Sequence, residues 1–271
     1  MGGDAHLTVV LPTLNGAAFL QEQLESIAVQ QRPPDLLLVS DDGSHDDTCA
    51  IVKAFAIHAP FDVILRKGPA LGLSANMRSL LAICPSGYVA LSDQDDVWLP
   101  HKLKQACTQL GNTSRPRMYA ARRMVTDASL TPLGLTRIPR MAPSFAHALY
   151  RNITPGNTVV LNPVAQALVK RVAQQIAPAP AFHDWWLYQL ITGVGGEVIF
   201  DPNPALLYRQ HGQNLFGSAL GLKAKIWRMK SRFDGTYRGW VHSQCRTLDA
   251  QRSNLMPQAT QHLDQFIARQ Y

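Results

Sequence analysis

The chain has 271 residues, of which 46% are hydrophobic and 17% are charged. This composition excludes a disordered protein, and the length suits one large domain with a sizeable core. The 26 lysines and arginines exceed the 19 acidic residues, so the net charge of +7 suits nucleic acid, an anionic membrane or a phosphorylated substrate as partner. No apolar run is long enough to span a membrane and no secretory signal is visible, so we expect a cytoplasmic protein.

The cysteines point to the same compartment. None of the four forms a C-x-x-C pair, and three of them sit among apolar residues. Free thiols in a reducing cytosol therefore fit better than disulfides or a zinc site. The four residues are Cys49, Cys84, Cys107 and Cys245.

The first half of the chain alternates between short apolar runs and amphipathic stretches. We predict strands at 7–11, 36–39, 63–65 and 88–91, and helices at 17–30, from 46 onward and at 75–84. Strand and helix alternating in this rhythm predict an α/β fold with a Rossmann-like, mostly parallel central sheet and helices on both of its faces.

The motif S-D-Q-D-D at residues 92–96 follows the strand predicted at 88–91. In an extended chain residues two apart point the same way, so Asp93 and Asp95 share one face. Two ionised carboxylates at one place repel each other, and a hard cation such as Mg²⁺ or Mn²⁺ with phosphate oxygens would compensate them. The alternative is an acidic turn that caps the next helix.

Polar residues also follow the first two predicted strands. Thr13 and Asn15 come after the first, and Asp41 and Asp42 after the second. Ligands of such sheets bind beyond the carboxyl ends of the strands, so these positions together predict a nucleotide site. The chain has neither G-x-G-x-x-G nor a P-loop, so a metal ion and basic side chains would have to balance the charge of the diphosphate. A carboxylate at 41 or 42 could accept the N3–H of uracil or thymine, which fits a UDP- or dTDP-sugar.

The second half of the chain does not continue the regular alternation of strands and helices. Residues 119–143 carry several prolines and basic residues and predict acceptor-facing loops. Further strands are expected near 157–161 and at 198–201, and helices from 163 and from 183. Residues 245–271 are polar and predict a helical tail.

The motifs V-L-P-T-L-N at 10–15, S-D-D-G-S at 40–44 and L-S-D-Q-D-D-V-W at 91–98 resemble those of the inverting family 2 glycosyltransferases of GT-A fold. The D-Q-D-D-x-W-L-P form is most similar to bacterial rhamnosyltransferase-like members that build polysaccharide. The resemblance covers about residues 6–215. It implies a GT-A domain over 1–216, with a nucleotide-sugar half at 6–115 and an acceptor and catalytic half at 116–216, followed by a basic helical extension at 217–271.

The resemblance also implies roles for single residues. Asp184 matches the catalytic base, although His183 stands where the family commonly has Glu. The metal would be held by Asp93, Asp95 and His211. The donor nucleotide would be bound by Pro12, Thr13, Asn15, Asp41, Asp42, Asn76 and Asp93. The donor sugar and the acceptor would be met by Gly156, Asn157, Asp96, Trp98, Trp185, Trp186 and Arg209.

Several of these residues have a structural alternative. Gly156 also fits a plain turn into a strand, and a lone histidine such as His211 is often structural. Trp185 and Trp186 either stack on sugar or pack in the core, and packing is expected for at least one of them.

The segment 219–240 holds much of the positive charge, interleaved with aromatic residues. This pattern fits a helix on an anionic membrane surface, and it also fits a solvated helix that packs one face on the domain. Nucleic acid is not expected, because the acidic site has no use for it.

The sequence thus predicts a metal-dependent inverting glycosyltransferase. It would move a sugar, with dTDP-L-rhamnose as one candidate donor, to a glycan or lipid-linked glycan in cell-surface polysaccharide synthesis, in the cytoplasm or at the inner face of the membrane. The alternatives are a sugar-1-phosphate nucleotidyltransferase and a non-catalytic sugar-nucleotide-binding protein. The first would want a glycine-rich basic loop where Pro12 to Asn15 stand, and the second would not need the acidic residues of the site.

Overall fold

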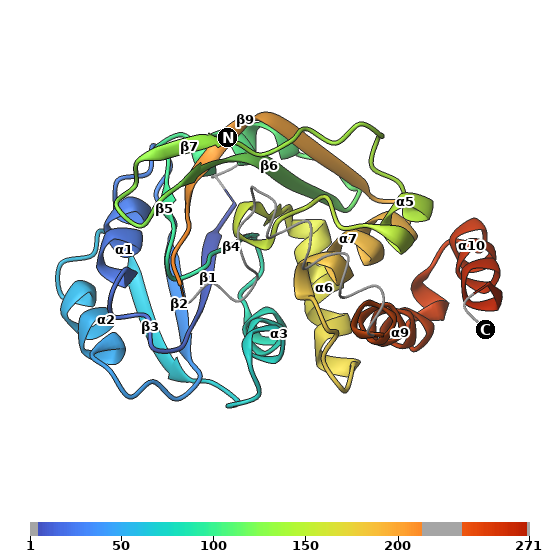
Figure 1. Cartoon of the computed structure of the whole chain (residues 1–271), viewed down its shortest axis with the longest axis horizontal. Helices are drawn as coiled ribbons and strands as arrows, with labels where there is room; N and C mark the ends of the chain where they lie inside the picture. Colours follow the sequence, from blue (N-terminus) through green and yellow to red (C-terminus); the bar gives the residue numbers. More distant parts are fainter. Residues whose placement is uncertain (1–4, 213–234, 270–271) are drawn as a thin grey trace.

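The computed structural model describes residues 5–212 and 235–269. Its centre is a nine-stranded mixed sheet with the strand order β3-β2-β1-β4-β8-β6-β9-β5, and β7 pairs with β6 (Figure 1). The first four strands are parallel to one another, as the sequence predicts. They are β1 (Leu7–Thr13), β2 (Leu36–Asp41), β3 (Asp62–Lys67) and β4 (Tyr88–Leu91).

Helices cover both faces of this sheet (Figure 1). Because side chains alternate along a strand, Val10 of β1 packs with one set of helices and Val9 and Leu11 pack with the other. The first set is α3 (Leu73–Ile83), α6 (Pro163–Gln175) and α7 (His183–Gly193). The second set is α1 (Leu20–Ala28), α2 (Thr48–Ala56) and α4 (Lys102–Leu110). Strands β1, β2 and β4 are buried along their whole length, which explains their continuous apolar sequence.

The second half of the sheet is mixed. Strand β8 runs antiparallel to both of its neighbours, β4 and β6, whereas β6 and β9 are parallel. The bounds are β5 (Val97–Trp98), β6 (Arg117–Thr126), β7 (Pro132–Leu135), α5 (Phe145–Tyr150), the 3₁₀ turn η1 (Gly156–Thr158), β8 (Val160–Leu161) and β9 (Glu197–Arg209).

The expectation of loops over 119–143 is wrong for its first part. Residues 117–126 form β6, a strand inside the sheet, because Met118 to Ala121 are buried between β8 and β9. The prolines begin only at Pro132, and the segment 136–143 after β7 is irregular.

The C-terminal helices α9 (Thr236–Asp249) and α10 (Pro257–Ala268) confirm the predicted helical tail. They pack on α5 and α7 through a separate apolar cluster, and the short 3₁₀ turn η2 (Arg252–Asn254) joins them. Figure 1 shows them stacked outside α7, away from the sheet. Most of the segment 219–240 lies outside the described residues, so its membrane contact stays a prediction.

The structure also bears on the cysteines and on membrane-spanning helices. All four cysteines are free thiols, and three of them are buried. Within the described ranges no helix combines the length and apolar character needed to cross a bilayer.

Candidate active site

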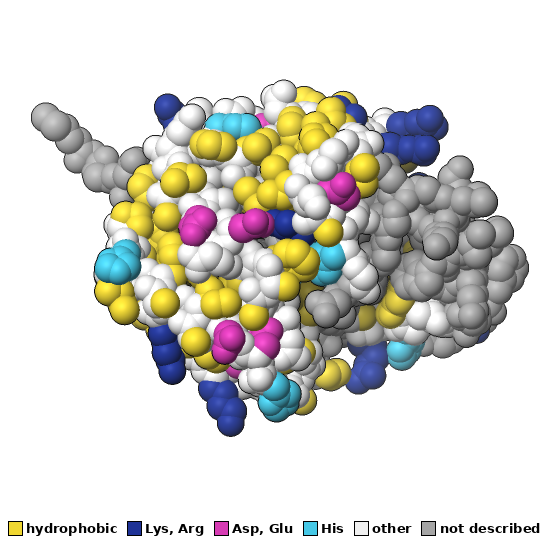
Figure 2. Space-filling view, turned by 60° about the vertical axis from the view of Figure 1, so that its left-hand side comes forward, with side chains coloured by type: hydrophobic (Ala, Val, Ile, Leu, Met, Phe, Trp, Pro, Cys, Tyr) yellow, Lys and Arg dark blue, Asp and Glu magenta, His cyan; other side chains and the backbone are white. Residues whose placement is uncertain are grey.

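The loop that follows β4 brings three carboxylates together. Asp93, Asp95 and Asp96 each offer an oxygen, and these oxygens lie within 4.8 Å of one another. The loop stands at the carboxyl end of a parallel strand, where ligands of open α/β sheets bind. On the face shown in Figure 2, acidic side chains lie toward the middle and most Lys and Arg stand near the outline, so the positive net charge is not spread evenly.

The charges of this carboxylate cluster are poorly compensated by the protein. Burial and the neighbouring charge of Asp95 raise the pKa of Asp93 to about 7. Burial, Asp95 and Asp93 raise the pKa of Asp96 well above its usual range, although Asn157 Nδ2 donates a 2.6 Å hydrogen bond to Asp96 Oδ2. The other oxygen of Asp96 has no hydrogen-bond partner among the described residues. Clustered carboxylate oxygens of this kind fit a hard divalent cation.

Lys102 is a buried cation beside this cluster that the sequence analysis did not single out. Its ammonium group donates a 2.6 Å hydrogen bond to the Asn157 carbonyl and lies 3.2 Å from the centre of the Trp98 ring. Burial lowers the pKa of Lys102 well below its usual range, against the attraction of Asp96 and Asp93. Lys102 and Asn157 thus tie the acidic loop to the turn η1.

The end of β9 closes over the same loop. His211 Nε2 lies 2.8 Å from Asp95 Oδ2, and the centre of its ring lies 4.5 Å from that of Phe19, with the two rings tilted by 36°. Arg209 donates from Nε to the Asp95 carbonyl at 3.1 Å and pairs with Glu22. His211 therefore lies next to Asp95, and its role as a metal ligand stays a prediction. The guanidinium of Arg209 instead donates hydrogen bonds to protein groups, which include the Ala128 carbonyl. Arg209 therefore helps to hold the acidic loop in place.

The loops after β1 and β2 meet the acidic loop at the same edge of the sheet. The Thr13 hydroxyl donates to Gln94 Oε1 at 2.6 Å. The backbone N–H of Asn15 donates to Ser44 Oγ at 2.8 Å, and Asn15 Oδ1 accepts the His45 N–H at 2.9 Å. The predicted nucleotide residues of the first two loops are thus adjacent in space, and Pro12 is part of β1 itself.

The carboxylates of Asp41 and Asp42 already accept hydrogen bonds from the protein. Asp41 accepts three from its own turn, two of them from Ser44. Asp42 accepts the N–H groups of Ala70 and Gly72, both at 2.8 Å. A carboxylate has about four acceptor positions, so Asp42 could still receive one base N–H, whereas Asp41 is also hydrogen-bonded to the Cys49 side chain. Asn76 is buried and donates to the Ser40 carbonyl at 2.8 Å, which places it beneath this loop.

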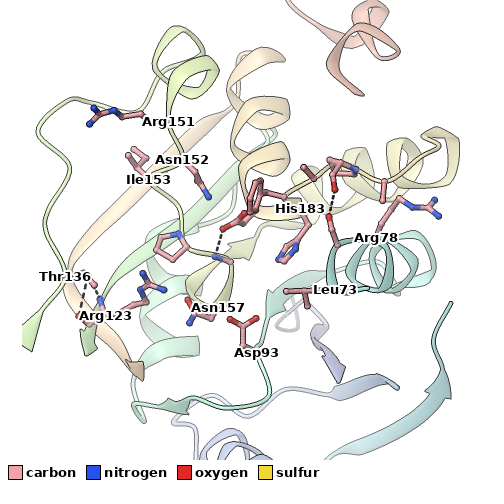
Figure 3. Close-up of a pocket in the computed structure, with 18 of the residues that line it drawn as sticks. Leu73, Arg78, Asp93, Arg123, Thr136, Arg151, Asn152, Ile153, Asn157 and His183 are labelled. Atoms are coloured by element: carbon pink, nitrogen blue, oxygen red, sulfur yellow. Dashed lines mark hydrogen bonds between the residues drawn. The ribbon is translucent and has the colours of Figure 1, made fainter. Parts of the chain in front are cut away.

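A cleft of about 1620 Å³ opens beside the acidic loop (Figure 3). Asp93, Gly156, Asn157 and Asp184 all line it. Asp184 stands in the first turn of α7, and its Oδ2 accepts the Gly156 N–H at 3.1 Å while its Oδ1 accepts the Trp185 N–H at 2.7 Å. A side chain on Gly156 would bring its Cβ to 2.9 Å from the ring of His183 and to 3.3 Å from Asp184, so only glycine lets the turn approach α7 this closely.

His183 also lines the cleft, a role that the sequence did not indicate. It is buried, and its Nε2 finds no hydrogen-bond partner in the described part of the chain. Burial lowers the pKa of His183.

The three tryptophans proposed for sugar or acceptor contact do not line the cleft. Trp98 and Trp186 are at most 2% exposed, and Trp185 is 5% exposed and donates from its indole to the Ala148 carbonyl at 2.5 Å. Their rings fill the three apolar clusters. The structure therefore favours the packing alternative for Trp185 and Trp186 and extends it to Trp98.

A Rossmann-like sheet with a carboxylate cluster at its carboxyl edge and a further carboxylate lining the cleft is the arrangement expected of a glycosyltransferase of GT-A fold. The model of glycosyl transferase family 2 matches residues 8–172. The chain belongs to this family.

Individual proteins with known names show the same likeness. The dTDP-rhamnosyl transferase RfbG of Shigella flexneri is 28% identical over 238 residues, which are 81% of this chain and 78% of that protein. The mannosyltransferase PcManGT of Pyrobaculum calidifontis, solved with GDP-Man and Mn²⁺, has a TM-score of 0.60 at 17% identity over 98% of this chain and 75% of its own. TarS 1–349 of S. aureus, solved with UDP-GlcNAc, has a TM-score of 0.59 at 16% identity, and the match covers 77% of this chain and 60% of that one.

Proposed function

We propose that the chain is a metal-dependent inverting glycosyltransferase that uses a UDP- or dTDP-sugar, with dTDP-L-rhamnose as the first candidate. The acceptor would be a hydroxyl of a glycan or lipid-linked glycan in cell-surface polysaccharide synthesis. The observation that carries the proposal is that Asp184 and Asp93 line one cleft, with Asp95 and Asp96 clustered beside Asp93. This arrangement offers a base for the acceptor and carboxylate ligands for an ion on the donor side.

In this mechanism Asp184 accepts the proton of the acceptor hydroxyl while the oxygen attacks the anomeric carbon. The nucleoside diphosphate leaves from the opposite face, so the configuration inverts. The N–H groups of Gly156 and Trp185 hold the carboxylate in position, and positioned base catalysis typically contributes about 10²–10⁴-fold. Asp93 and Asp95, with His211, would hold Mg²⁺ or Mn²⁺, which neutralises charge on the leaving diphosphate when it is bound.

The choice of donor rests on the relatives. The curated relative carries a dTDP-rhamnosyl name, whereas the solved neighbours hold UDP-GlcNAc and GDP-Man. In this proposal Asp41 or Asp42 accepts the N3–H of the base, which uracil and thymine both offer. Thr13 and Asn15 flank the nucleoside.

The deciding experiment measures nucleotide release from dTDP-L-rhamnose, UDP-glucose, UDP-GlcNAc and GDP-mannose, with Mn²⁺, with Mg²⁺ and with EDTA. We expect metal-dependent release of dTDP or UDP, and an inverted anomeric centre in the product by NMR. Pyrophosphate release from dTTP and a sugar 1-phosphate, tested in parallel, would instead identify a nucleotidyltransferase. Metal-independent release, or none from any donor, would contradict the proposal.

We also propose, from the sequence of 219–240, that the protein binds anionic membranes. Each cationic side chain near such a surface is worth about 1 kcal/mol and is screened by salt. We expect salt-sensitive binding to phosphatidylglycerol vesicles, which the combined change of Lys223, Lys225, Arg228 and Lys230 to Glu abolishes while donor hydrolysis stays intact. A wild-type protein that ignores these vesicles at low salt would contradict this.

A further inference from the structure

The cleft carries far more positive than negative side chains. Among the residues that the structure describes, five arginines line it but only two carboxylates, Asp93 and Asp184, and both of these have proposed roles in the transfer itself. The arginines are Arg78, Arg123, Arg137, Arg140 and Arg151. An excess of cations in the wall of a substrate cleft raises the local concentration of anionic ligands.

Two of the five already have protein partners. Arg78 donates to the carbonyls of Ala173 and Ile176 at 2.9 and 3.2 Å, so it caps the end of α6. Arg123 lies 4.1 Å from the centre of the Tyr208 ring, and its charge partly offsets the rise in the pKa of Asp93 and Asp96. These two arginines therefore serve the acidic loop and the helix packing.

The other three form what we call the arginine rim: Arg137, Arg140 and Arg151. All three side chains are exposed, and none pairs with an Asp or Glu in the ranges that the structure describes. Arg137 and Arg140 come from the segment between β7 and α5, and Arg151 follows α5. In Figure 3, Arg151 lies well away from Asp93, with Asn157 nearer to the carboxylate. Arg151 thus lies in the part of the cleft away from the proposed metal.

Exposed apolar side chains also line the cleft. Ile138 and Met141, which alternate with the rim arginines, are 48% and 63% exposed and line the cleft, as does Leu71 at 73%. Large apolar side chains that stay exposed beside unpaired arginines suit a ligand with an anionic group and an apolar part.

We propose that the arginine rim binds a phosphoryl group carried by the acceptor, so that the acceptor substrate is a phosphate or diphosphate conjugate and not a neutral glycan. This inference rests on the proposed function, because it assigns the far part of the cleft to the acceptor. Arginine forks match phosphoryl oxygens with paired hydrogen bonds, and no carboxylate in the described chain competes for them. Ile138 and Met141, which follow Arg137 and Arg140 in the sequence, take the adjoining apolar part of the molecule.

The test measures binding and needs neither donor nor turnover. Monooctyl phosphate is titrated in EDTA into the full-length protein by calorimetry, and the ring signals of His147 are followed by NMR. His147 lines the cleft, and the charge of Arg151 contributes to its lowered pKa, so an anion at the rim should raise that pKa. We expect the combined change of Arg137, Arg140 and Arg151 to Gln to weaken binding at least about tenfold and to remove the His147 shift.

The matched control changes Arg115, Arg171 and Arg246 to Gln, which removes the same charge from exposed arginines outside the cleft. We expect this control to bind within about twofold of the wild type. Inorganic phosphate and octyl glucoside separate the sources of affinity. Tighter binding of octyl phosphate than of inorganic phosphate supports a lipid-linked acceptor, and equal binding supports a phosphoryl site for a soluble one.

Three results would overturn the inference: no binding of octyl phosphate, equal losses in the rim variant and the control, or equal affinity for octanoate or octyl glucoside. Failure of the donor panel together with rim-dependent binding would reject the proposed transfer and keep the phosphoryl site. Metal-dependent donor hydrolysis without rim-dependent binding of octyl phosphate would keep the proposed transfer and reject the phosphoryl site.

Discussion

Asp184 is held by two backbone N–H groups, one from its own helix and one from the turn at Gly156. Each oxygen therefore has one fixed donor and can still accept a further hydrogen bond, as a general base must. Its hydrogen bonds separate this one residue from the carboxylate cluster, in which Asp96 accepts from Asn157.

Asp184→Asn should lower kcat by about 10²–10⁴-fold and leave the affinity for the donor nucleotide nearly unchanged, because the amide cannot take the acceptor proton. Steady-state kinetics and calorimetry with the nucleotide and Mn²⁺ check the two parts. Asp62→Asn, an exposed carboxylate on β3, is the control. Turnover close to that of the wild type would remove Asp184 from the catalytic role.

The buried ammonium group of Lys102 holds the turn η1 through its hydrogen bond to the Asn157 carbonyl. Lys102→Met keeps an apolar side chain against Trp98 but leaves the buried Asn157 carbonyl without its donor, so the free energy of unfolding should fall by about 2 kcal/mol. Lys104→Met, two residues along the same helix and exposed, should change it by less than about 0.5 kcal/mol. Urea denaturation measures both, and equal effects would show that Lys102 does not hold η1.

At the scale of elements, helix α7 connects the site to the C-terminal tail. Its first turn carries Asp184 into the cleft, while Trp185 and Trp186 on its other sides fill two different apolar clusters. Helix α9 packs against the residue that precedes α7, since the rings of Trp240 and Phe182 meet edge to face at 5.0 Å and Gln244 donates to the Phe182 carbonyl at 3.0 Å. The tail therefore supports the position of the proposed base.

Trp240→Ala should lower the free energy of unfolding by about 1–3 kcal/mol through the lost aromatic contacts. It should also raise KM for the acceptor more than for the donor, because the loop before Asp184 loses its support while the acidic loop keeps its own. Gln258→Ala, exposed on α10, is the control. A stability equal to that of the wild type would argue that Trp240 has another role, such as the membrane contact proposed from the sequence.

For the whole molecule, the proposed metal site joins distant parts of the chain. Asp93, Asp95 and Asp96 follow β4, whereas His211 follows β9 and Asn157 belongs to η1. A ligand held by groups from both parts binds the folded state alone, so it should stabilise the fold as a unit.

Mn²⁺ with UDP or dTDP should raise the unfolding temperature, and a concentration 100-fold above Kd corresponds to about 2.7 kcal/mol. Asp95→Asn should lose this increase, because an amide is a poorer ligand for a hard cation, and Asp62→Asn should keep it. Differential scanning calorimetry with and without EDTA measures the effect. An unchanged metal-dependent increase in Asp95→Asn would contradict the metal assignment.

The sequence by itself determined the parallel half of the fold and the edge of the sheet at which the candidate site lies. Strands β1, β2 and β4 are continuous apolar runs, and each is followed by polar residues. Short stretches of sequence therefore indicate both the sheet and the edge at which a ligand would bind. The helical tail and the free cysteines were equally readable, because they depend on nearby residues.

Only the tertiary structure decided which side chains reach the cleft. Trp98, Trp185 and Trp186 look like sugar platforms in the sequence, yet packing from distant helices buries them. Lys102 reads as an ordinary basic residue and Arg209 as a substrate contact until the fold brings Asn157 and Asp95 to them. Burial and ion pairing depend on neighbours that are far apart in the chain, and local patterns of polarity do not record those neighbours.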